Sequence, residues 1–218
     1  MRNKFDMQLG RLNEQLTHMG ELCELAINRV TKALVNGSID QAKKVMDADD
    51  EIDQMEKDIE RLCLKLLLQQ QPVARDLRQI SAALKMITDM ERIGDQTADI
   101  AEIIISAGMS EVGDVKKIEE MSSGVAKMVN DSVTAYVDRD LELARKVMEA
   151  DDNIDQLFNE IRGTIIRMIA QGNKGEQGVD LIMIAKYLER IGDHATNIAE
   201  WVEFSITGVH KGMQTVDA

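Results

Sequence analysis

The chain reads VMDADDEIDQM at residues 45–55 and VMEADDNIDQL at residues 147–157, an offset of 102 residues (45 against 147). A second phrase, ERIGD, occurs at 91–95 and again at 189–193, an offset of 98 residues (91 against 189). The 102-residue offset also aligns Met19 with Met121 and Leu34 with Tyr136. Repeated phrases in the same order indicate an internal duplication, with the second copy shortened between the two phrases.

Apolar residues recur every three or four positions along both copies, which is the period of an α-helix. The pattern is interrupted at 36–38, near 71–72, at 107–113, at Asp138 and through 172–178, where Gly, Pro, Asn and Asp gather. The chain is therefore predicted to be all-α, with six helices over 3–35, 39–70, 74–106, 114–137, 140–171 and 177–206. These form two tandem three-helix bundles, residues 1–110 and 111–218, the second ending in a short C-terminal tail.

The composition limits the classes of function. Of 218 residues, 44% are hydrophobic and only 3% aromatic, and the net charge is −13. An acidic surface disfavours nucleic acid, whose phosphates require Lys and Arg. The apolar runs are far shorter than the roughly 20 residues of a membrane span, and no signal peptide is recognisable, so we expect a cytoplasmic protein without direct membrane insertion. Cys23 and Cys63 are expected to be small buried side chains.

Acidic residues interrupt the apolar stripes of four predicted helices. On a helical wheel Glu91 continues the inward line of Ile80, Leu84 and Ile87, and Asp49 falls between Val45 and Ile52. Each copy thus carries a D-x-x-x-D pair on one helix and an E-x-x-x-D pair on the next. The pairs are Asp49/Asp53 and Glu91/Asp95 in the first copy, and Asp151/Asp155 and Glu189/Asp193 in the second.

Carboxylates four residues apart on a helix repel each other, and a half-buried carboxylate is costly unless it is paired or bound to metal. One interpretation is an ion-pair network in which Arg92 and Arg190 neutralise the acids. The other is an oxygen-ligated metal site, suited to Mg²⁺, Ca²⁺, Mn²⁺ or iron. No E-x-x-H motif of a ferritin-like di-iron oxidase is present. His194 is expected on the helix surface, with an outer metal ligand as the alternative, and the mid-helix Gly94 and Gly192 suggest close helix packing.

The duplicated arrangement resembles the PhoU family of bacterial phosphate-transport regulators. The resemblance covers essentially the whole chain. It rests on MDADDEIDQM at 46–55, on Gln71-Pro72 followed by Asp76-Leu77-Arg78, and on ERIGD in both copies.

The resemblance implies a cytoplasmic negative regulator of phosphate uptake and of the phosphate-starvation response. It implies an adaptor between the ATPase subunit of the phosphate ABC transporter and a sensor histidine kinase, peripheral to the inner face of the membrane through the transporter. It also implies a homodimer. It also implies multinuclear iron or zinc clusters on the paired acids. Carried over by position, the metal ligands would be Asp49, Asp53, Glu91, Asp95 and Asp99, and then Asp151, Asp155, Glu189, Asp193 and Asn197. The neutral Asn197 stands where the first copy has Asp99, so we expect looser metal binding in the second copy.

Two rival functions remain open. One is a metal-free helical scaffold whose acids make only ion pairs. The other is a metal-dependent hydrolase, which is disfavoured because no nucleophile–base pair and no Gly-rich phosphate loop is recognisable. We therefore expect a regulatory protein and not an enzyme.

Overall fold

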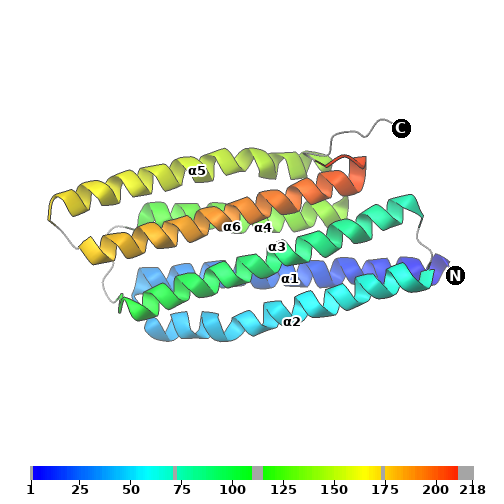
Figure 1. Cartoon of the computed structure of the whole chain (residues 1–218), viewed down its shortest axis with the longest axis horizontal. Coiled ribbons are helices and arrows are strands. Elements are labelled where there is room, and N and C mark those ends of the chain that lie inside the picture. The colour runs from blue at the N-terminus through cyan, green and yellow to red at the C-terminus, as the bar shows by residue number, and fades with distance from the viewer. Residues whose placement is uncertain (1, 71–72, 110–114, 173–174, 211–218) are drawn as a thin grey trace.

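A computed structural model describes residues 2–70, 73–109, 115–172 and 175–210 (Figure 1). The described residues form six α-helices joined by short connections. These are α1 (Arg2–Asn36), α2 (Ile39–Gln70), α3 (Ala74–Ser106), α4 (Lys116–Asp138), α5 (Leu141–Ala170) and α6 (Gly175–Thr207). The predicted fold class and the six helices are confirmed, with ends within about two residues of those read from periodicity. The predicted start of the fourth helix at 114 and the predicted domain boundary at 110/111 lie outside the described residues.

The same turn joins the first two helices of each copy. Gly37 has φ 60°, and Arg139, its counterpart at the 102-residue offset, has φ 57°. The following residue in each copy caps the next helix: the Ser38 hydroxyl accepts from the Gln41 amide at 3.3 Å, and the Asp140 carboxylate accepts from the Leu143 amide at 2.9 Å. The second copy thus keeps the left-handed turn although a non-glycine residue occupies it.

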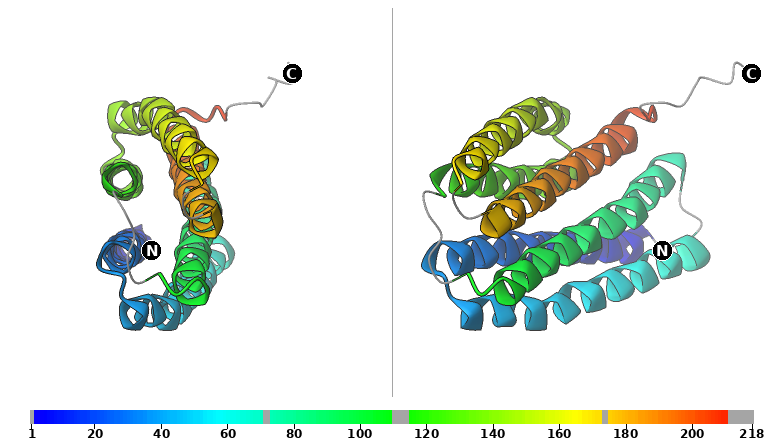
Figure 2. Two further views of the ribbon diagram at one scale, coloured as in Figure 1. Left: turned by 90° about the vertical axis from the view of Figure 1, so that its left-hand side faces the viewer. Right: turned by 60° about the vertical axis from the view of Figure 1, so that its left-hand side comes forward.

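The two bundles pack against each other through α1 with α4 and α3 with α6, while α2 and α5 lie on opposite outer sides (Figure 2). A pseudo-two-fold axis relates the contacts. The Gly20 backbone approaches Val133, and a Cβ at Gly20 would lie 3.2 Å from the Val133 side chain. The positions related by the duplication, Ser122 and Thr31, hydrogen-bond to each other.

One hydrophobic core runs through both bundles, from Phe5 in α1 to Val202 in α6. Tyr136 of α4 is fully buried in it, and its hydroxyl donates to the Gln79 carbonyl of α3 at 2.8 Å. The predicted burial of Cys23 and Cys63 is confirmed, and both are free thiols. Within the described part of the chain, no helix is both long and apolar enough to span a bilayer.

Candidate functional site

The acidic pairs of the first copy face each other between α2 and α3. The pKa of Asp49 is raised to about 6, chiefly by burial and then by the negative charges of Asp95, Asp53 and Glu91 in that order. Burial also raises the pKa of Glu91, as does the charge of Asp95. All four side chains are partly buried. The helical wheel permits this approach of the two pairs but does not require it, and we name these four residues the first acidic cluster.

Gly94 makes room for the deepest of these carboxylates. A Cβ at Gly94 would lie 2.7 Å from Asp49 Oδ1 and 3.2 Å from the Ile52 side chain. Asp49 Oδ1 is buried and has no hydrogen-bond partner. A buried acceptor without a donor is costly, so this atom is positioned to accept a cation or a proton. The expectation that Gly94 marks close helix packing is confirmed.

Cations already screen part of the first acidic cluster. Arg92 lies 3.5 Å from Glu91 Oε2 and 2.9 Å from Asp95 Oδ2, and Lys57 lies 3.8 Å from Asp53. Arg92 is exposed, as is Lys57, so these three ion pairs are weak and can be released at low cost. The predicted neutralising role of Arg92 is confirmed, but neither cation reaches Asp49 Oδ1.

The second copy repeats the arrangement more loosely, with Asp151, Asp155, Glu189 and Asp193 forming the second acidic cluster. Burial raises the pKa of Asp151, as do the charges of Asp193 and Asp155. A Cβ at Gly192 would lie 3.5 Å from Asp151 Oδ1, so the approach is less close than in the first copy. Asp155 and Asp193 are exposed.

A lysine engages the remaining acid of the second acidic cluster. Lys186, one turn before Glu189 on α6, forms an ion pair with it. Arg190, predicted to neutralise the acids, instead lies 5.8 Å from the ring centroid of Tyr187. Lys186 therefore precedes the acid that it screens, Glu189, whereas Arg92 follows the acid that it screens, Glu91.

Asp99 and Asn197, which complete the two acidic rows in the sequence, lie at the contact between α3 and α6. Burial raises the pKa of Asp99, as do Asp95 and Glu102, whereas hydrogen bonding from Tyr187 and the charge of Arg190 lower it. Asn197 Nδ2 donates to Asp89 Oδ1 at 3.1 Å. Both side chains therefore interact with the other bundle, a role that the sequence did not reveal.

The sequence also missed the role of His194 and Asp89. Instead of lying free on the helix surface, the His194 side chain is 22% exposed and its Nδ1 lies 2.9 Å from Asp89 Oδ1. Residues 89–99 and 187–197 differ at six positions, and three of these, 89/187, 96/194 and 99/197, lie on one side of α3 and α6, so the differences alone did not single out this contact.

The chemistry of the first acidic cluster fits a hard cation, although the side chains are not gathered around one. Carboxylate oxygens suit such ions, and Asp49 Oδ1 is an orphaned buried acceptor. Among the described residues, no three His, Cys, Asp or Glu side chains are placed to hold an ion as they stand. Binding would therefore require Arg92 to release Glu91 and Asp95.

Comparison with known proteins agrees with this architecture. The PhoU domain family model matches the chain twice, over residues 16–104 and 118–202. The chain belongs to the PhoU family. A Clostridium acetobutylicum protein named phosphate-specific transport system accessory protein PhoU homolog is 37% identical over 210 residues, covering 95% of this chain and 96% of that protein.

Two solved PhoU structures share the fold. The crystal structure of PhoU from Pseudomonas aeruginosa superposes with a TM-score of 0.87 and 32% identity, covering 94% of this chain and 100% of that one. The phosphate transport system regulatory protein PhoU from Streptococcus pneumoniae gives a TM-score of 0.89 and 25% identity, covering 95% and 99%. Both PhoU repeats are therefore present over nearly the whole chain.

Proposed function

We propose that the chain is a cytoplasmic negative regulator of phosphate uptake and of the phosphate-starvation response. It would act as an adaptor between the ATPase subunit of the phosphate ABC transporter and a sensor histidine kinase. The observation that carries the proposal is the match of both halves to the PhoU domain together with nearly full-length similarity to accessory proteins of phosphate-specific transport. The protein would act by binding, as a homodimer, and not by catalysis.

A co-purification experiment tests the adaptor role. The full chain is mixed with the transporter ATPase subunit, with the kinase, or with both, in the presence and absence of phosphate, and complexes are measured by size-exclusion chromatography with light scattering. We expect a complex with each partner and a change in its stability with phosphate. Failure to bind either partner under all conditions would refute the role, and a monomer at all concentrations would refute the homodimer.

We further propose that both acidic clusters bind metal, with iron or zinc as the first candidates and Mg²⁺, Mn²⁺ and Ca²⁺ as alternatives. Asp49, Asp53, Glu91 and Asp95, with Asp99 at the edge, would hold it in the first copy. The second site would use Asp151, Asp155, Glu189, Asp193 and Asn197. Bound metal would neutralise the mutual repulsion of the acids and would give the protein a surface that accepts anions.

Elemental analysis of protein purified without chelators tests the metal proposal, and a thermal-shift titration with each ion provides a second readout. A ligand that binds only the folded state raises the unfolding temperature. We expect the rise to be smaller in Asp49→Ala than in Asp47→Ala, an exposed residue of the same helix. No stoichiometric metal and no shift would favour the metal-free scaffold. Turnover of a phosphoester that disappears in Glu91→Ala would favour the hydrolase.

A further inference from the structure

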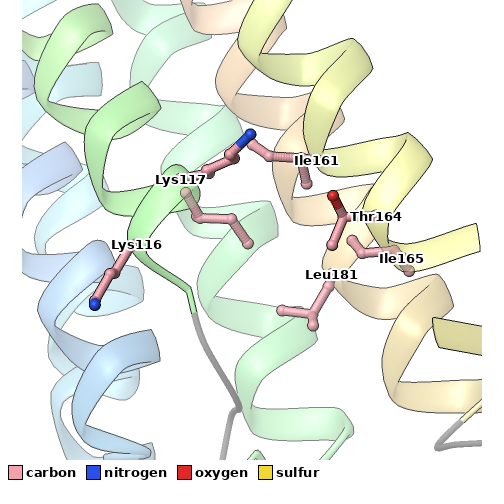
Figure 3. A pocket seen from close by; sticks show the side chains of 7 residues that line it. Lys116, Lys117, Ile161, Thr164, Ile165 and Leu181 are labelled. Carbon is pink, nitrogen blue, oxygen red and sulfur yellow. The ribbon is translucent and has the colours of Figure 1, made fainter. Parts of the chain in front are cut away.

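Several cations of this acidic chain are paired with acids. Lys117 lines a pocket of about 300 Å³ between α4, α5 and α6 (Figure 3) and pairs with Glu160. Arg145 lies 3.0 Å from Glu203. Three arginines differ, because their guanidinium groups form no hydrogen bond and no ion pair within the part of the chain that the structure describes. We call them the arginine cluster: Arg75, Arg78 and Arg139.

The packing of α3 against the turn between α4 and α5 brings the arginine cluster together. α3 begins and α4 ends at the same end of the molecule (Figure 1). Arg75 and Arg78 are three residues apart and share one face of the first turns of α3. The Tyr136 hydroxyl donates to the carbonyl of Gln79, the residue after Arg78, at 2.8 Å. Arg139 follows Tyr136 by three residues, so the turn that carries it is held beside the start of α3.

The arginine cluster is partly removed from water. Arg78 and Arg139 are half-buried, and Arg75 is exposed. The backbone of Gly208, just beyond α6, covers Arg78, since a Cβ on this glycine would lie 3.6 Å from Arg78 Nε. Arg78 Nε is buried and has no hydrogen-bond partner among the described residues. A buried donor without an acceptor is costly, so this atom is positioned to donate to an anion.

The three cations also act on one another. Burial lowers the pKa of Arg139, and the charges of Arg75 and Arg78 lower it as well. Tyr136 and Asp76 act in the opposite direction, but Asp76 forms no ion pair with the cluster in the described parts of the chain. An anion between the guanidinium groups would therefore offset both their burial and their mutual repulsion.

The backbone at Arg139 has φ 57°, a left-handed conformation that is unusual for a residue with a side chain. The first copy places Gly37 at this position, and glycine adopts the conformation without strain. The 98-residue offset places Asn173 and Glu176 at the positions of the other two arginines. The arginine cluster is therefore not a consequence of the duplicated fold, and it is kept in one copy despite strain in the backbone.

We propose that the arginine cluster binds a phosphoryl group, either as free phosphate or as the phosphate of a small monoester. A guanidinium group presents a planar fork of donors that matches phosphate oxygens, and three such forks can serve several oxygens at once. A phosphoryl group carries a charge of about −1.5 to −2 near neutral pH, whereas a carboxylate carries a single charge. The phosphoryl group therefore offsets three cations more fully. The site is separate from both acidic clusters and depends neither on metal nor on the proposed adaptor role.

Calorimetric titration of the full chain with sodium phosphate, in a low-chloride buffer with a chelator, tests the site. The chelator removes metal, so anion binding through metal at the acidic clusters does not contribute. We expect saturable binding of phosphate or of glycerol phosphate, with acetate at least about tenfold weaker. Binding of glycerol phosphate alone would identify a monoester as the ligand, and binding of phosphate alone would identify the free ion. Equal binding of both would show that the phosphoryl group is sufficient.

Substitutions locate the binding. Arg139→Gly removes one cation and restores the glycine of the first copy, so it should keep the melting temperature of the wild type while binding phosphate at least about tenfold more weakly. Arg78→Gln should weaken binding in the same way. Arg29→Gln is the matched control, because Arg29 is exposed and lines a rival basic groove with Lys32 and Lys44. Its affinity for phosphate should equal that of the wild type.

Nitrogen NMR provides a readout at the unsatisfied donor itself. The Nε–H resonance of Arg78 should shift when phosphate is added to the wild type and should stay in place in Arg139→Gly. This distinguishes loss of the site from a general loss of positive charge.

Four outcomes would overturn the proposal. These are no saturable binding of either phosphoryl compound, undiminished binding by Arg139→Gly, loss of binding in Arg29→Gln, and binding of acetate as tight as that of phosphate. The first three would show that the cluster is not the site, and the fourth would show that it recognises charge alone. All are measured without a partner protein, so they leave the adaptor role standing. Failure of the chain to bind the transporter or the kinase would, in turn, leave the phosphoryl site standing.

Discussion

The burial of Asp49 predicts an unusual dependence of stability on pH. Its pKa is about 6 in the folded protein against an ordinary value of 3.8. Because the folded state binds the proton more tightly, the stability contributed by this group is fully present below about pH 3.8 and is lost as the pH rises through about 6. In the absence of metal, the carboxylate therefore destabilises the protein at neutral pH, and Asp49→Asn should relieve that cost.

The magnitude follows from the difference between the two pKa values. At about 1.4 kcal/mol for each pH unit, a rise from 3.8 to about 6 corresponds to about 3 kcal/mol. The carboxyl is only partly buried, so screening by water reduces the expected gain to on the order of 1–2 kcal/mol. Asp49→Asn should accordingly be more stable than the wild type by that amount at pH 7.5 and of nearly equal stability at pH 4.

Urea unfolding followed by circular dichroism, with a chelator present and at pH values from 4 to 8, measures the effect. Asp47→Asn is the matched control, since it makes the same change of charge at an exposed position on the same helix. Its stability should differ from the wild type by a pH-independent amount within about 0.5 kcal/mol. If Asp49→Asn were less stable than the wild type at pH 7.5, or if the difference did not change with pH, the conclusion that Asp49 is held charged and unpaired at neutral pH would be refuted.

Three further substitutions test the packing of the two copies. Gly94→Ala would place a Cβ 2.7 Å from Asp49 Oδ1 and should cost about 1–3 kcal/mol in urea unfolding, clearly more than Gly192→Ala, whose Cβ meets nothing closer than 3.3 Å. Asp89→Ala removes the acceptor of two hydrogen bonds from α6 and should lower the free energy of unfolding by about 1–3 kcal/mol, and an unchanged value would show that the α3–α6 contact is not formed in solution. Asn197→Asp would place a carboxylate against Asp89 and should destabilise the protein by a similar amount. Adding Asp89→Asn should recover that stability, which thermal melts of the single and double variants can show.

Local patterns in the sequence account for most of the fold. Helix periods and the breaks at 36–38 and at Asp138 predicted the six helices, because each depends on neighbours within one or two turns. The wheel also places Asp49 and Glu91 within the apolar stripes of their helices, which permits their approach but does not by itself require it. The Arg92 ion pairs follow from i, i+3 spacing in the same way.

The contact between the bundles could not be predicted in this way. An amphipathic wheel shows that α3 has a broad apolar face, but it does not divide that face between α2 in its own copy and α6 in the other. Spacing therefore groups Asp99 with Asp95, one turn away, although Asp99 also faces Tyr187 of α6. The wheel likewise places His194 on the helix surface, because its partner Asp89 is far away in the sequence.

The pseudo-two-fold contact gives a physical reason for the change from Asp99 to Asn197. Position 89 faces position 197 across it, and position 99 faces position 187. If both copies carried the residues of the first, Asp would face Asp at both places and the carboxylates would repel each other. With Tyr187 and Asn197 in the second copy, each acid instead faces a neutral donor. The difference between the copies is thus explained by how they pair with each other, whereas the acids that face away from the contact, Asp49 and Asp151, are retained in both.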